Sequence, residues 1–218
     1  MVALLLASRS PRRRELLYLL GIPFEVVSPR VQEHVVSGED ASEVALRLAR
    51  MKAEAAARME QGKIIVAADT VVVLRGRVMG KPAGAAAASA MLGALRGSEH
   101  QVISGLAVLD PAGQGITVQA VETRVWMRNY RAEEIADYIA RGEPFDKAGG
   151  YAIQDPIFHP VREIEGCYAN VMGLPLCHLY LRFKEMGFPL LTSPLRACET
   201  YSGEPCLVAP QILRQDNH

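Results

Sequence analysis

The sequence predicts an α/β fold. Short apolar runs such as 2–7 and 64–73 have the length and the residue types of buried strands. Segments with helical periodicity and capping signals alternate with these runs along the chain. With 218 residues, half of them hydrophobic, the chain can bury a substantial core as one domain, with or without an appendage.

The first strand, at 2–7, is expected to turn directly into a helix. Ser10 is a good N-cap and Pro11 suits the first helical position, so the helix should run to near Gly21. A helix N-terminus offers free amide groups and a partial positive charge, which together attract phosphate oxygens.

Three further residues, Ser8, Arg12 and Arg13, stand beside this helix N-terminus. Basic residues there oppose the helix dipole, so a bound anion explains them better than a basic surface helix does. The chain contains no G-x-x-x-x-G-K-[ST] motif. We therefore predict a phosphate site that is not a P-loop.

A second strand, at 24–27, leads to Glu33 in a polar loop, and a long helix is expected from Asp40 to about Gln61. Lys52 falls on the core-facing flank of that helix. Its side chain either follows the apolar surface out to water or extends into a cleft, and the sequence leaves both alternatives open.

The stretch 63–82 gives the strongest indication of function. Asp69 lies within a run of mostly β-branched apolar residues, where an ionised carboxylate is costly without a cation, a metal or several donors. We expect Asp69 to end a strand at the floor of a polar cleft, with the Thr70 hydroxyl beside it. A turn at 75–77 then brings Lys81 back toward Asp69. The alternative is a structural hairpin in which Asp69 caps a turn.

The second half of the chain continues the alternation of helices and strands. We predict a helix at 83–95, an antiparallel pair of strands at 100–109 and 116–128 joined by a turn at 110–115, a helix at 130–141 and a last helix ending near Met186. The segment 142–154 combines glycines and a proline with Asp146 and Lys147, which is typical of loops that hold a ligand. Gln154 can both donate to and accept from a base edge.

Composition excludes several classes of protein. The formal net charge is zero, from 24 basic and 24 acidic residues, so we expect no nucleic-acid partner. No apolar run approaches the roughly 20 residues of a membrane-spanning helix, and the N-terminal apolar run lacks the preceding charge of a signal peptide. We expect a cytoplasmic protein with no membrane partner. Four cysteines lack C-x-x-C spacing and are expected to be free thiols: Cys167, Cys177, Cys198 and Cys206. Two histidines, His159 and His178, lack partners at metal spacing and are expected to be structural.

Five motifs occur in a specific order along the chain. They are S-R-S-P-R-R at 8–13, A-A-D-T-V at 67–71, G-K-P at 80–82, D-K-A-G-G-Y-A-I-Q at 146–154 and N-V-M-G-L-P-L at 170–176. Together they resemble the Maf family of nucleoside triphosphate pyrophosphatases over 1–188. The resemblance implies an elongated mixed sheet flanked by helices, with a central cleft between two lobes, as in the inosine triphosphate pyrophosphatases. The segment 189–218 matches nothing expected of the family and shows no clear periodicity, so we expect a loosely packed or disordered extension. The alternative is that it covers a neighbouring subunit in a dimer, and the sequence does not separate the two.

The resemblance also implies an activity, which is hydrolysis of a nucleoside triphosphate between its α and β phosphates. In the family the acid of the A-A-D-T motif is the proposed general base, which here is Asp69. The family's other phosphate-binding and catalytic positions match Ser8, Arg12, Arg13, Glu33, Lys52, Lys81 and Gln154. The resemblance further implies a divalent cation, usually Mg²⁺ with Mn²⁺ as an alternative, and a homodimer.

The preferred nucleotide is predicted from the branch of the family that the chain resembles. The branch that acts on dTTP and UTP carries an arginine, the threonine after the catalytic acid and the last glutamine of its motif, which match Arg12, Thr70 and Gln154. CTP is a further candidate. Two other functions remain open: removal of modified purine nucleotides such as 7-methyl-GTP, and a non-catalytic nucleotide-binding regulator of division.

The residue types support the same chemistry independently of the family. The negative charges of a triphosphate call for cations, which Arg12, Arg13, Lys52 and Lys81 supply. Two carboxylates, Asp69 and Glu33, are suited to hold Mg²⁺ or to orient a water for in-line attack on the α-phosphorus. The sequence does not separate those two roles.

Overall fold

A mixed sheet forms the centre of the computed structural model, which describes residues 3–34, 38–111, 115–190 and 192–214. Its seven strands are β1 (Leu4–Ala7), β2 (Phe24–Val27), β3 (Ile64–Leu74), β4 (Arg77–Met79), β5 (Glu99–Leu109), β6 (Ile116–Met127) and β7 (Val161–Glu165). They lie in the order β2-β1-β3-β5-β6-β7, and β4 pairs with β3. β1 is parallel to β2 and to β3, and the other pairs are antiparallel. The predicted α/β class with a mixed sheet is confirmed.

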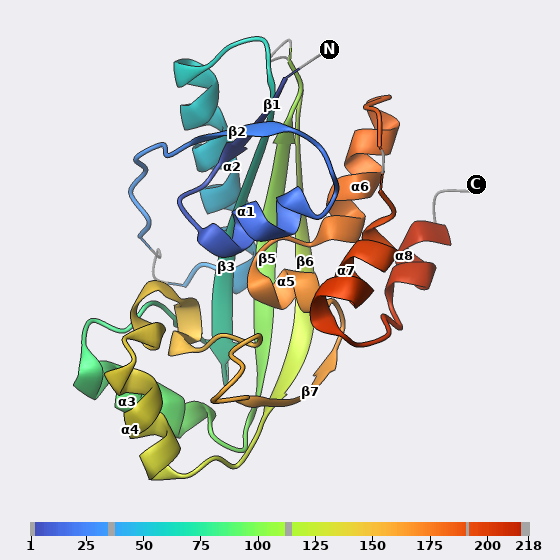
Figure 1. Cartoon of the computed structure of the whole chain (residues 1–218). Coiled ribbons are helices and arrows are strands. Elements are labelled where there is room, and N and C mark those ends of the chain that lie inside the picture. Colours follow the sequence, from blue (N-terminus) through green and yellow to red (C-terminus); the bar gives the residue numbers. More distant parts are fainter. Residues whose placement is uncertain (1–2, 35–37, 112–114, 191, 215–218) are drawn as a thin grey trace.

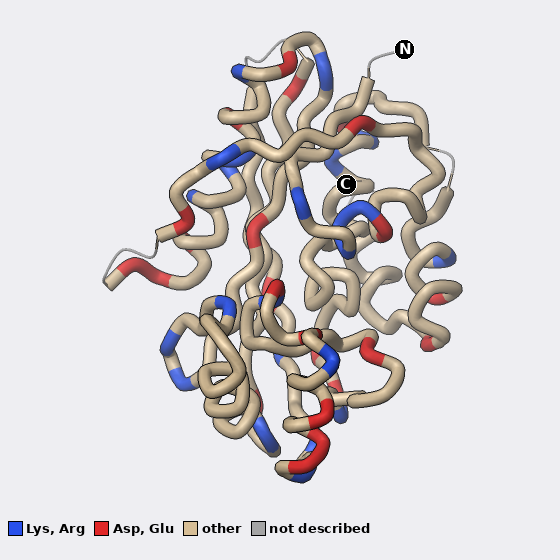
Figure 2. Tube along the Cα trace, turned by 60° about the vertical axis from the view of Figure 1, so that its left-hand side comes forward, with Lys and Arg blue, Asp and Glu red and all other residues tan. Residues whose placement is uncertain are grey.

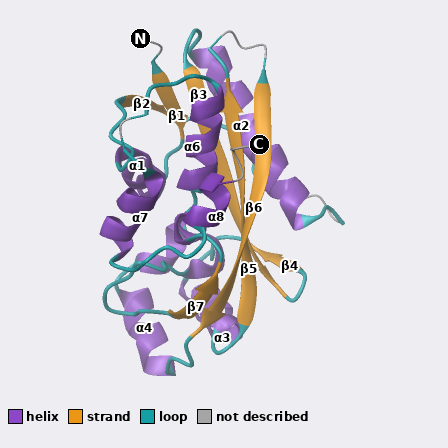
Figure 3. Ribbon diagram, turned by 90° about the vertical axis from the view of Figure 1, so that its right-hand side faces the viewer, coloured by secondary structure: helices purple, strands orange, loops and turns teal. Residues whose placement is uncertain are grey.

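Helices cover both faces of the sheet. They are α1 (Pro11–Tyr18), α2 (Ala41–Met59), α3 (Ala85–Leu95), α4 (Ala132–Ala140), α5 (Tyr168–Met172), α6 (Leu176–Glu185), α7 (Pro194–Ser202) and α8 (Ala209–Arg214), with 3₁₀ helices η1 (Glu143–Asp146) and η2 (Ala148–Gly150) after α4. α2 covers one face, whereas α1, α6 and α7 cover the other (Figure 3).

The molecule has two lobes along the long strands β3, β5 and β6 (Figure 1). The upper lobe contains β1, β2, α1, α2 and α6 to α8. The lower lobe contains β4, β7, α3, α4, η1 and η2, and α5 lies between the two. The elongated two-lobed arrangement expected from the family resemblance is therefore present.

Side chains of β1 alternate between two apolar layers of the upper lobe. Leu4 and Leu6 pack in the layer formed with α1, α5 and α6. Leu5 and Ala7 pack in the opposite layer, against the small alanine side chains of α2. Because both faces of these strands are covered, their sequences are continuously apolar rather than alternating.

A glycine in β5 lets α2 lie close to the sheet. Gly105 pairs with Asp69 of β3. A Cβ atom at Gly105 would lie 2.2 Å from the backbone oxygen of Ala45 in α2, which leaves no room for a side chain. The close approach carries Lys52, about two turns further along α2, toward β3.

A gap in the sheet opens one edge of β3. β1 pairs with β3 at 64–66 and β4 pairs with the same edge at 72–74, so that 67–71 pair with β5 alone. Asp69 and Thr70 lie in this gap and point to opposite faces of the sheet, as successive strand residues do. The expectation that Asp69 ends a strand is wrong. Asp69 lies in the middle of β3, and the missing edge partner gives it access to a cleft.

The antiparallel pair predicted in the second half of the chain is confirmed as β5 and β6. β7 was not predicted, because a five-residue edge strand with a half-exposed pattern gives little periodicity. Two parts of the expected elements, Val2 in the first strand and 112–114 in the turn, lie outside the described residues.

The C-terminal extension contains two helices, α7 and α8. Cys198 is buried in the apolar layer that contains Leu16 of α1 and Phe183 of α6. The hydroxyl of Tyr201 donates to Glu15 of α1 at 3.2 Å. We expected a loosely packed or disordered segment. The structure instead places α7 and α8 against the upper lobe, while 191 and 215–218 lie outside the described residues.

Candidate active site

A cleft of about 440 Å³ opens beside the gap in β3. This volume suits a small-molecule ligand. Its lining includes Ser8 and Thr70, three acidic residues and seven basic ones: Glu33, Asp69, Asp146, Arg9, Arg12, Arg13, Arg30, Lys52, Lys81 and Lys147. Such an excess of positive charge, in a chain with zero net charge, indicates an anionic ligand.

Elsewhere the two signs of charge are mixed. Figure 2 shows Lys and Arg interspersed with Asp and Glu over the whole trace. The cleft is therefore a local concentration of positive charge. Among the described helices, none has the length and apolar character needed to cross a membrane.

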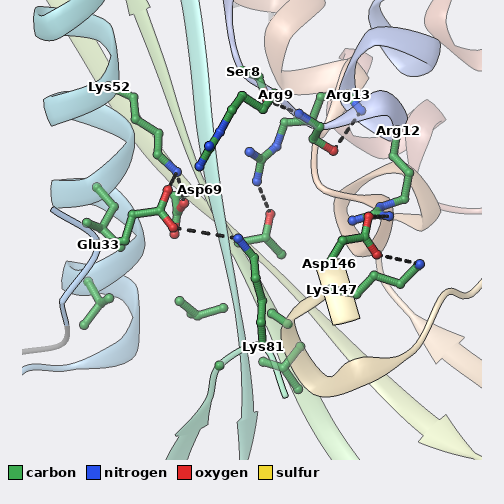
Figure 4. Close-up of a pocket in the computed structure, with 18 of the residues that line it drawn as sticks. Ser8, Arg9, Arg12, Arg13, Glu33, Lys52, Asp69, Lys81, Asp146 and Lys147 are labelled. Carbon is green, nitrogen blue, oxygen red and sulfur yellow. Dashed lines mark hydrogen bonds and ion pairs between the residues drawn. The ribbon is translucent and has the colours of Figure 1, made fainter. Parts of the chain in front are cut away.

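Lys52 joins two carboxylates at one side of the cleft (Figure 4). Its Nζ lies 2.6 Å from Oε1 of Glu33 and 2.5 Å from Oδ1 of Asp69. The side chains of Lys52 and Asp69 are only 11% and 12% exposed, and charges that are this well buried are costly unless they are paired. Of the two alternatives left open for Lys52, the structure shows extension into the cleft.

Glu33 is held by contacts from both lobes. The loop that carries it is fixed to α2 by Arg47, whose guanidinium donates to the backbone oxygen of His34 at 3.0 Å. Lys81 approaches Glu33 from the lower lobe, with Nζ 3.8 Å from Oε2. Burial alone would raise the pKa of Glu33, but its hydrogen bond to Lys52 and the neighbouring positive charges lower this pKa overall. Glu33 is consequently ionised at neutral pH.

Arg13 is fixed on the face of β3 toward which Thr70 points, opposite to the face of Asp69. Its Nη2 donates to Oγ1 of Thr70 at 3.1 Å, and its Nε donates to the backbone oxygen of Gly173 at 2.8 Å. Burial lowers the pKa of Arg13, partly offset by the negative charge of Asp69. The guanidinium remains a cation because its ordinary pKa is so high.

The turn between β1 and α1 supplies the predicted cap. Ser10 is the N-cap, and its hydroxyl accepts from the amide of Arg13 at 3.5 Å. The hydroxyl of Ser8 accepts from the amide of Ser10 at 3.1 Å, which orders the turn at the edge of the cleft. Arg9 extends from the same turn toward Lys52 and Asp69 (Figure 4).

Asp146 connects the two lobes across the cleft. Its Oδ2 accepts from Nη1 of Arg12 at 2.9 Å, and its Oδ1 accepts from Nζ of Lys147 at 2.7 Å. Lys147 also donates to the backbone oxygen of Glu143. Burial alone would raise the pKa of Asp146, but the hydrogen bond from Lys147 and the charge of Arg12 lower it overall.

Comparison with known proteins identifies the family. A family model described as Maf-like protein matches residues 3–186. The chain belongs to the Maf family. A relative from Geotalea uraniireducens, named dTTP/UTP pyrophosphatase, is 50% identical over 184 residues, which is 84% of this chain and 95% of the relative. A relative of the same name from Thermomicrobium roseum is 46% identical over 210 residues, which is 96% of this chain and 95% of the relative. Its alignment therefore reaches into the C-terminal extension.

The sequence predicts eight of the ten charged residues that line the Maf cleft, but one predicted site residue lies elsewhere. Gln154 is not among the residues that line the cleft. Its Oε1 is buried and has no hydrogen-bond partner in the described part of the chain. The predicted contact between Gln154 and a base edge stays a prediction.

Sequence reasoning did not predict several residues of the Maf cleft, among them Arg9, Arg30 and Tyr151. The cluster of four arginines in the first 14 residues was the available signal for Arg9. Tyr151 lies inside the D-K-A-G-G-Y motif, and its hydroxyl contacts Nε2 of the buried His100 at 2.7 Å. That pairing joins positions 51 residues apart, which no local pattern reveals.

The remaining histidine and cysteine residues are separate from the site. His159 and His178 do not line the cleft. Within the described ranges, no group of three or more His, Cys, Asp or Glu side chains could hold a metal by itself. All four cysteines are free, and only Cys206 is partly exposed.

Proposed function

We propose that this Maf protein hydrolyses dTTP and UTP to the monophosphate and pyrophosphate. The observation that carries the proposal is the contact of Lys52 with both Glu33 and Asp69 in a cleft lined by seven basic residues. A site that only bound nucleotides would need the cations but not two carboxylates that share one of them. The names of the relatives from Geotalea uraniireducens and Thermomicrobium roseum support the two substrates.

Asp69 is the proposed base of the reaction. It accepts a proton from a water whose oxygen attacks the α-phosphorus, and the bond from that phosphorus to the α,β-bridging oxygen breaks, so that pyrophosphate leaves. Lys52 fixes the orientation of Asp69 through their contact. Arg12, Arg13 and Lys81 supply donors for the phosphate oxygens, on which negative charge is concentrated.

A divalent cation fits beside the same carboxylates. Glu33 and Asp69 converge on one ammonium group, so their oxygens lie close together. Mg²⁺ is commonly held by one or two carboxylates plus substrate phosphates and does not need a cage of protein ligands. Glu33 and Asp69 would hold Mg²⁺, or Mn²⁺ in its place, and the ion would supply positive charge against the phosphates. As a metal ligand, Asp69 would still be required for turnover.

Product analysis tests this function. The protein would be incubated with Mg²⁺ and dTTP, UTP, CTP, 7-methyl-GTP or ITP, with Asp69→Asn in parallel. We expect monophosphate and pyrophosphate from dTTP and UTP, and a loss of at least about 10²-fold in Asp69→Asn. Preference for 7-methyl-GTP would instead identify an enzyme for modified purines. Nucleotide binding without any product would identify a non-catalytic regulator, and release of orthophosphate would contradict the proposed bond cleavage.

The location of the protein is a separate proposal. All four cysteines are free thiols. Free thiols are typical of reducing compartments such as the cytoplasm. We infer a cytoplasmic enzyme, which labelling of the protein in fractionated cells would test.

A further inference from the structure

A chain of hydrogen bonds leads from the cleft into the interior of the sheet. Nη2 of Arg13 donates to Oγ1 of Thr70 at 3.1 Å. Oγ1 of Thr70 lies 2.9 Å from Oγ of Ser104 in β5, and Oγ of Ser104 donates to the backbone oxygen of Asn170 at 3.1 Å. Ser104 is fully buried and does not line the cleft. The hydroxyl of Thr70 nevertheless links it to Arg13, which lines the cleft.

The direction of these hydrogen bonds follows from the groups at the two ends. A guanidinium only donates and a backbone oxygen only accepts. Since the single hydroxyl proton of Ser104 goes to Asn170, Ser104 has to accept in its contact with Thr70. Thr70 therefore donates its own proton to Ser104 and keeps its lone pairs for Arg13. Removing the hydroxyl of Ser104 would leave the Thr70 proton without its acceptor.

The series of hydrogen bonds ends at Asn170, whose own side chain is fixed to the sheet. Nδ2 of Asn170 donates to the backbone oxygen of Val102 at 3.1 Å and to Oγ1 of Thr123 at 3.0 Å. Asn170 belongs to α5, and the residue that follows α5, Gly173, accepts from Nε of Arg13. Arg13 is thus held at two points, both of which depend on where α5 sits.

Close packing leaves Arg13 and Thr70 little freedom around Gly173. A Cβ atom at Gly173 would lie 3.2 Å from Oγ1 of Thr70 and 3.3 Å from Nε of Arg13. The backbone φ of Gly173 is +112°, a conformation that residues with side chains rarely adopt. The guanidinium, the hydroxyl and the backbone therefore meet at one crowded point. A change in the rotamer of Thr70 would displace Arg13.

We propose that Ser104 is a positioning residue of the active site, which fixes the rotamer of Thr70 and through it the guanidinium of Arg13. The proposal rests on the proposed function, because Arg13 matters to catalysis only if it binds the phosphates. It gives Thr70 a role as the partner of Arg13. Small displacements of a phosphate-binding group are enough to slow a reaction of this kind.

A double-mutant cycle of Ser104→Ala and Thr70→Val tests the inference. Each variant removes one hydroxyl and changes the volume little. We expect each single variant to lower kcat/KM for UTP by about tenfold, because each releases the same guanidinium. The double variant should fall less than about twofold below the single variants, since residues that act through one another are not additive. Multiplication of the two losses, or full activity in Ser104→Ala, would overturn the positioning role.

Tyr130→Phe is the matched control for loss of a buried hydroxyl. The hydroxyl of Tyr130 is also buried and donates to the backbone oxygen of Leu92 at 2.7 Å, in the lower lobe. We expect its loss to lower the unfolding temperature as much as Ser104→Ala does, with kcat/KM unchanged. An equal loss of activity in Tyr130→Phe would show that destabilisation alone accounts for the effect, and would overturn the inference.

A binding measurement separates this inference from the proposed function. The same cycle is repeated on the affinity for inorganic pyrophosphate, measured by calorimetry, which needs no turnover. Non-additive losses of affinity would support the positioning of Arg13 by Ser104 even in a protein that hydrolysed nothing. Additive losses in an active enzyme would contradict the role of Ser104 and leave the hydrolysis intact.

Discussion

The two lobes contribute to the cleft in different ways. The upper lobe supplies Lys52, whose side chain is 11% exposed and which contacts two carboxylates within 2.6 Å. The lower lobe supplies Lys81 and Asp146, whose side chains are 54% and 55% exposed. Buried ion pairs are held in one geometry by the surrounding packing, whereas exposed pairs are screened and exchange with water. We infer that the buried pair of Lys52 and Asp69 fixes the reacting groups, whereas Lys81 and Asp146 make weaker contacts that exchange with water.

The largest effect is expected from breaking the buried cluster of the upper lobe. Lys52→Met leaves Glu33 and Asp69 facing one another without their shared cation. Removing one partner of a buried pair costs on the order of 3 kcal/mol, and we expect kcat/KM to fall by about 10³-fold because Asp69 loses its orientation. Denaturant unfolding and steady-state kinetics check the two effects separately.

Lys63→Met is the matched control for that variant. Lys63 also contacts two carboxylates, those of Glu25 and Glu60, but at the surface. Its loss should leave both stability and kcat/KM close to those of the native protein. If Lys63→Met lowered stability and kcat/KM as much as Lys52→Met does, burial would not explain why the contacts of Lys52 matter more than those of Lys63.

The core of the lower lobe should make stability depend on pH. His100 is buried, and burial lowers its pKa from 6.5 to about 4. The unfolded chain therefore takes up a proton near pH 6.5, whereas the folded protein does so only near pH 4. Stability from the neutral imidazole is present above pH 6.5 and is lost as the pH falls toward 4, by about 3 kcal/mol. Urea unfolding at pH 7, 6, 5 and 4 measures it.

His100→Gln should make the measured decline between pH 6.5 and 4 smaller by the contribution of this imidazole. His34→Gln, which removes an exposed imidazole from the upper lobe, should keep it. If the native protein, His100→Gln and His34→Gln all lost the same stability between pH 6.5 and 4, groups other than His100 would be responsible. The core of the lower lobe would then have no special part in the acid sensitivity.

A smaller effect on the upper lobe is expected from Arg9. Arg9 is exposed, lines the cleft and points toward Lys52 and Asp69 (Figure 4). Arg9→Gln should raise KM for UTP by about threefold to tenfold, and the increase should shrink at high salt because the lost contribution is electrostatic. Arg50→Gln, on the exposed side of α2, is the control and should leave KM unchanged. An effect on kcat with KM unchanged would count against a role for Arg9 in substrate binding.

Much of this site could be predicted from the sequence, because the cost of burying a charge does not depend on topology. Asp69 inside an apolar strand required a neutralising group and a cleft wherever the strand lay. What the sequence could not provide was the geometry. The gap in β3 depends on which strands pair with it, and the approach of Lys52 depends on Gly105, in a strand that follows it by some fifty residues.

Residues with ordinary side chains were missed for the same reason. Ser104 is one of several serines in the chain, and its importance depends on Thr70, 34 residues away, and on Asn170, 66 residues away. The C-terminal extension was misjudged because α7 and α8 are too short to give a clear periodicity. Their order comes from packing on α1 and α6, which only the folded structure shows.

The smallest effect is expected at the contact between the lobes. Asp146→Asn removes the charge that joins Arg12 to Lys147 but keeps the size of the side chain. Because the side chain of Asp146 is more than half exposed, we expect stability to change by less than about 1 kcal/mol, and kcat/KM for UTP to change by less than about fivefold. A loss approaching that of Lys52→Met would show that the lower lobe also fixes the reacting groups. The difference drawn between the two lobes would then be wrong, because an exposed contact would control the chemistry as strongly as a buried one.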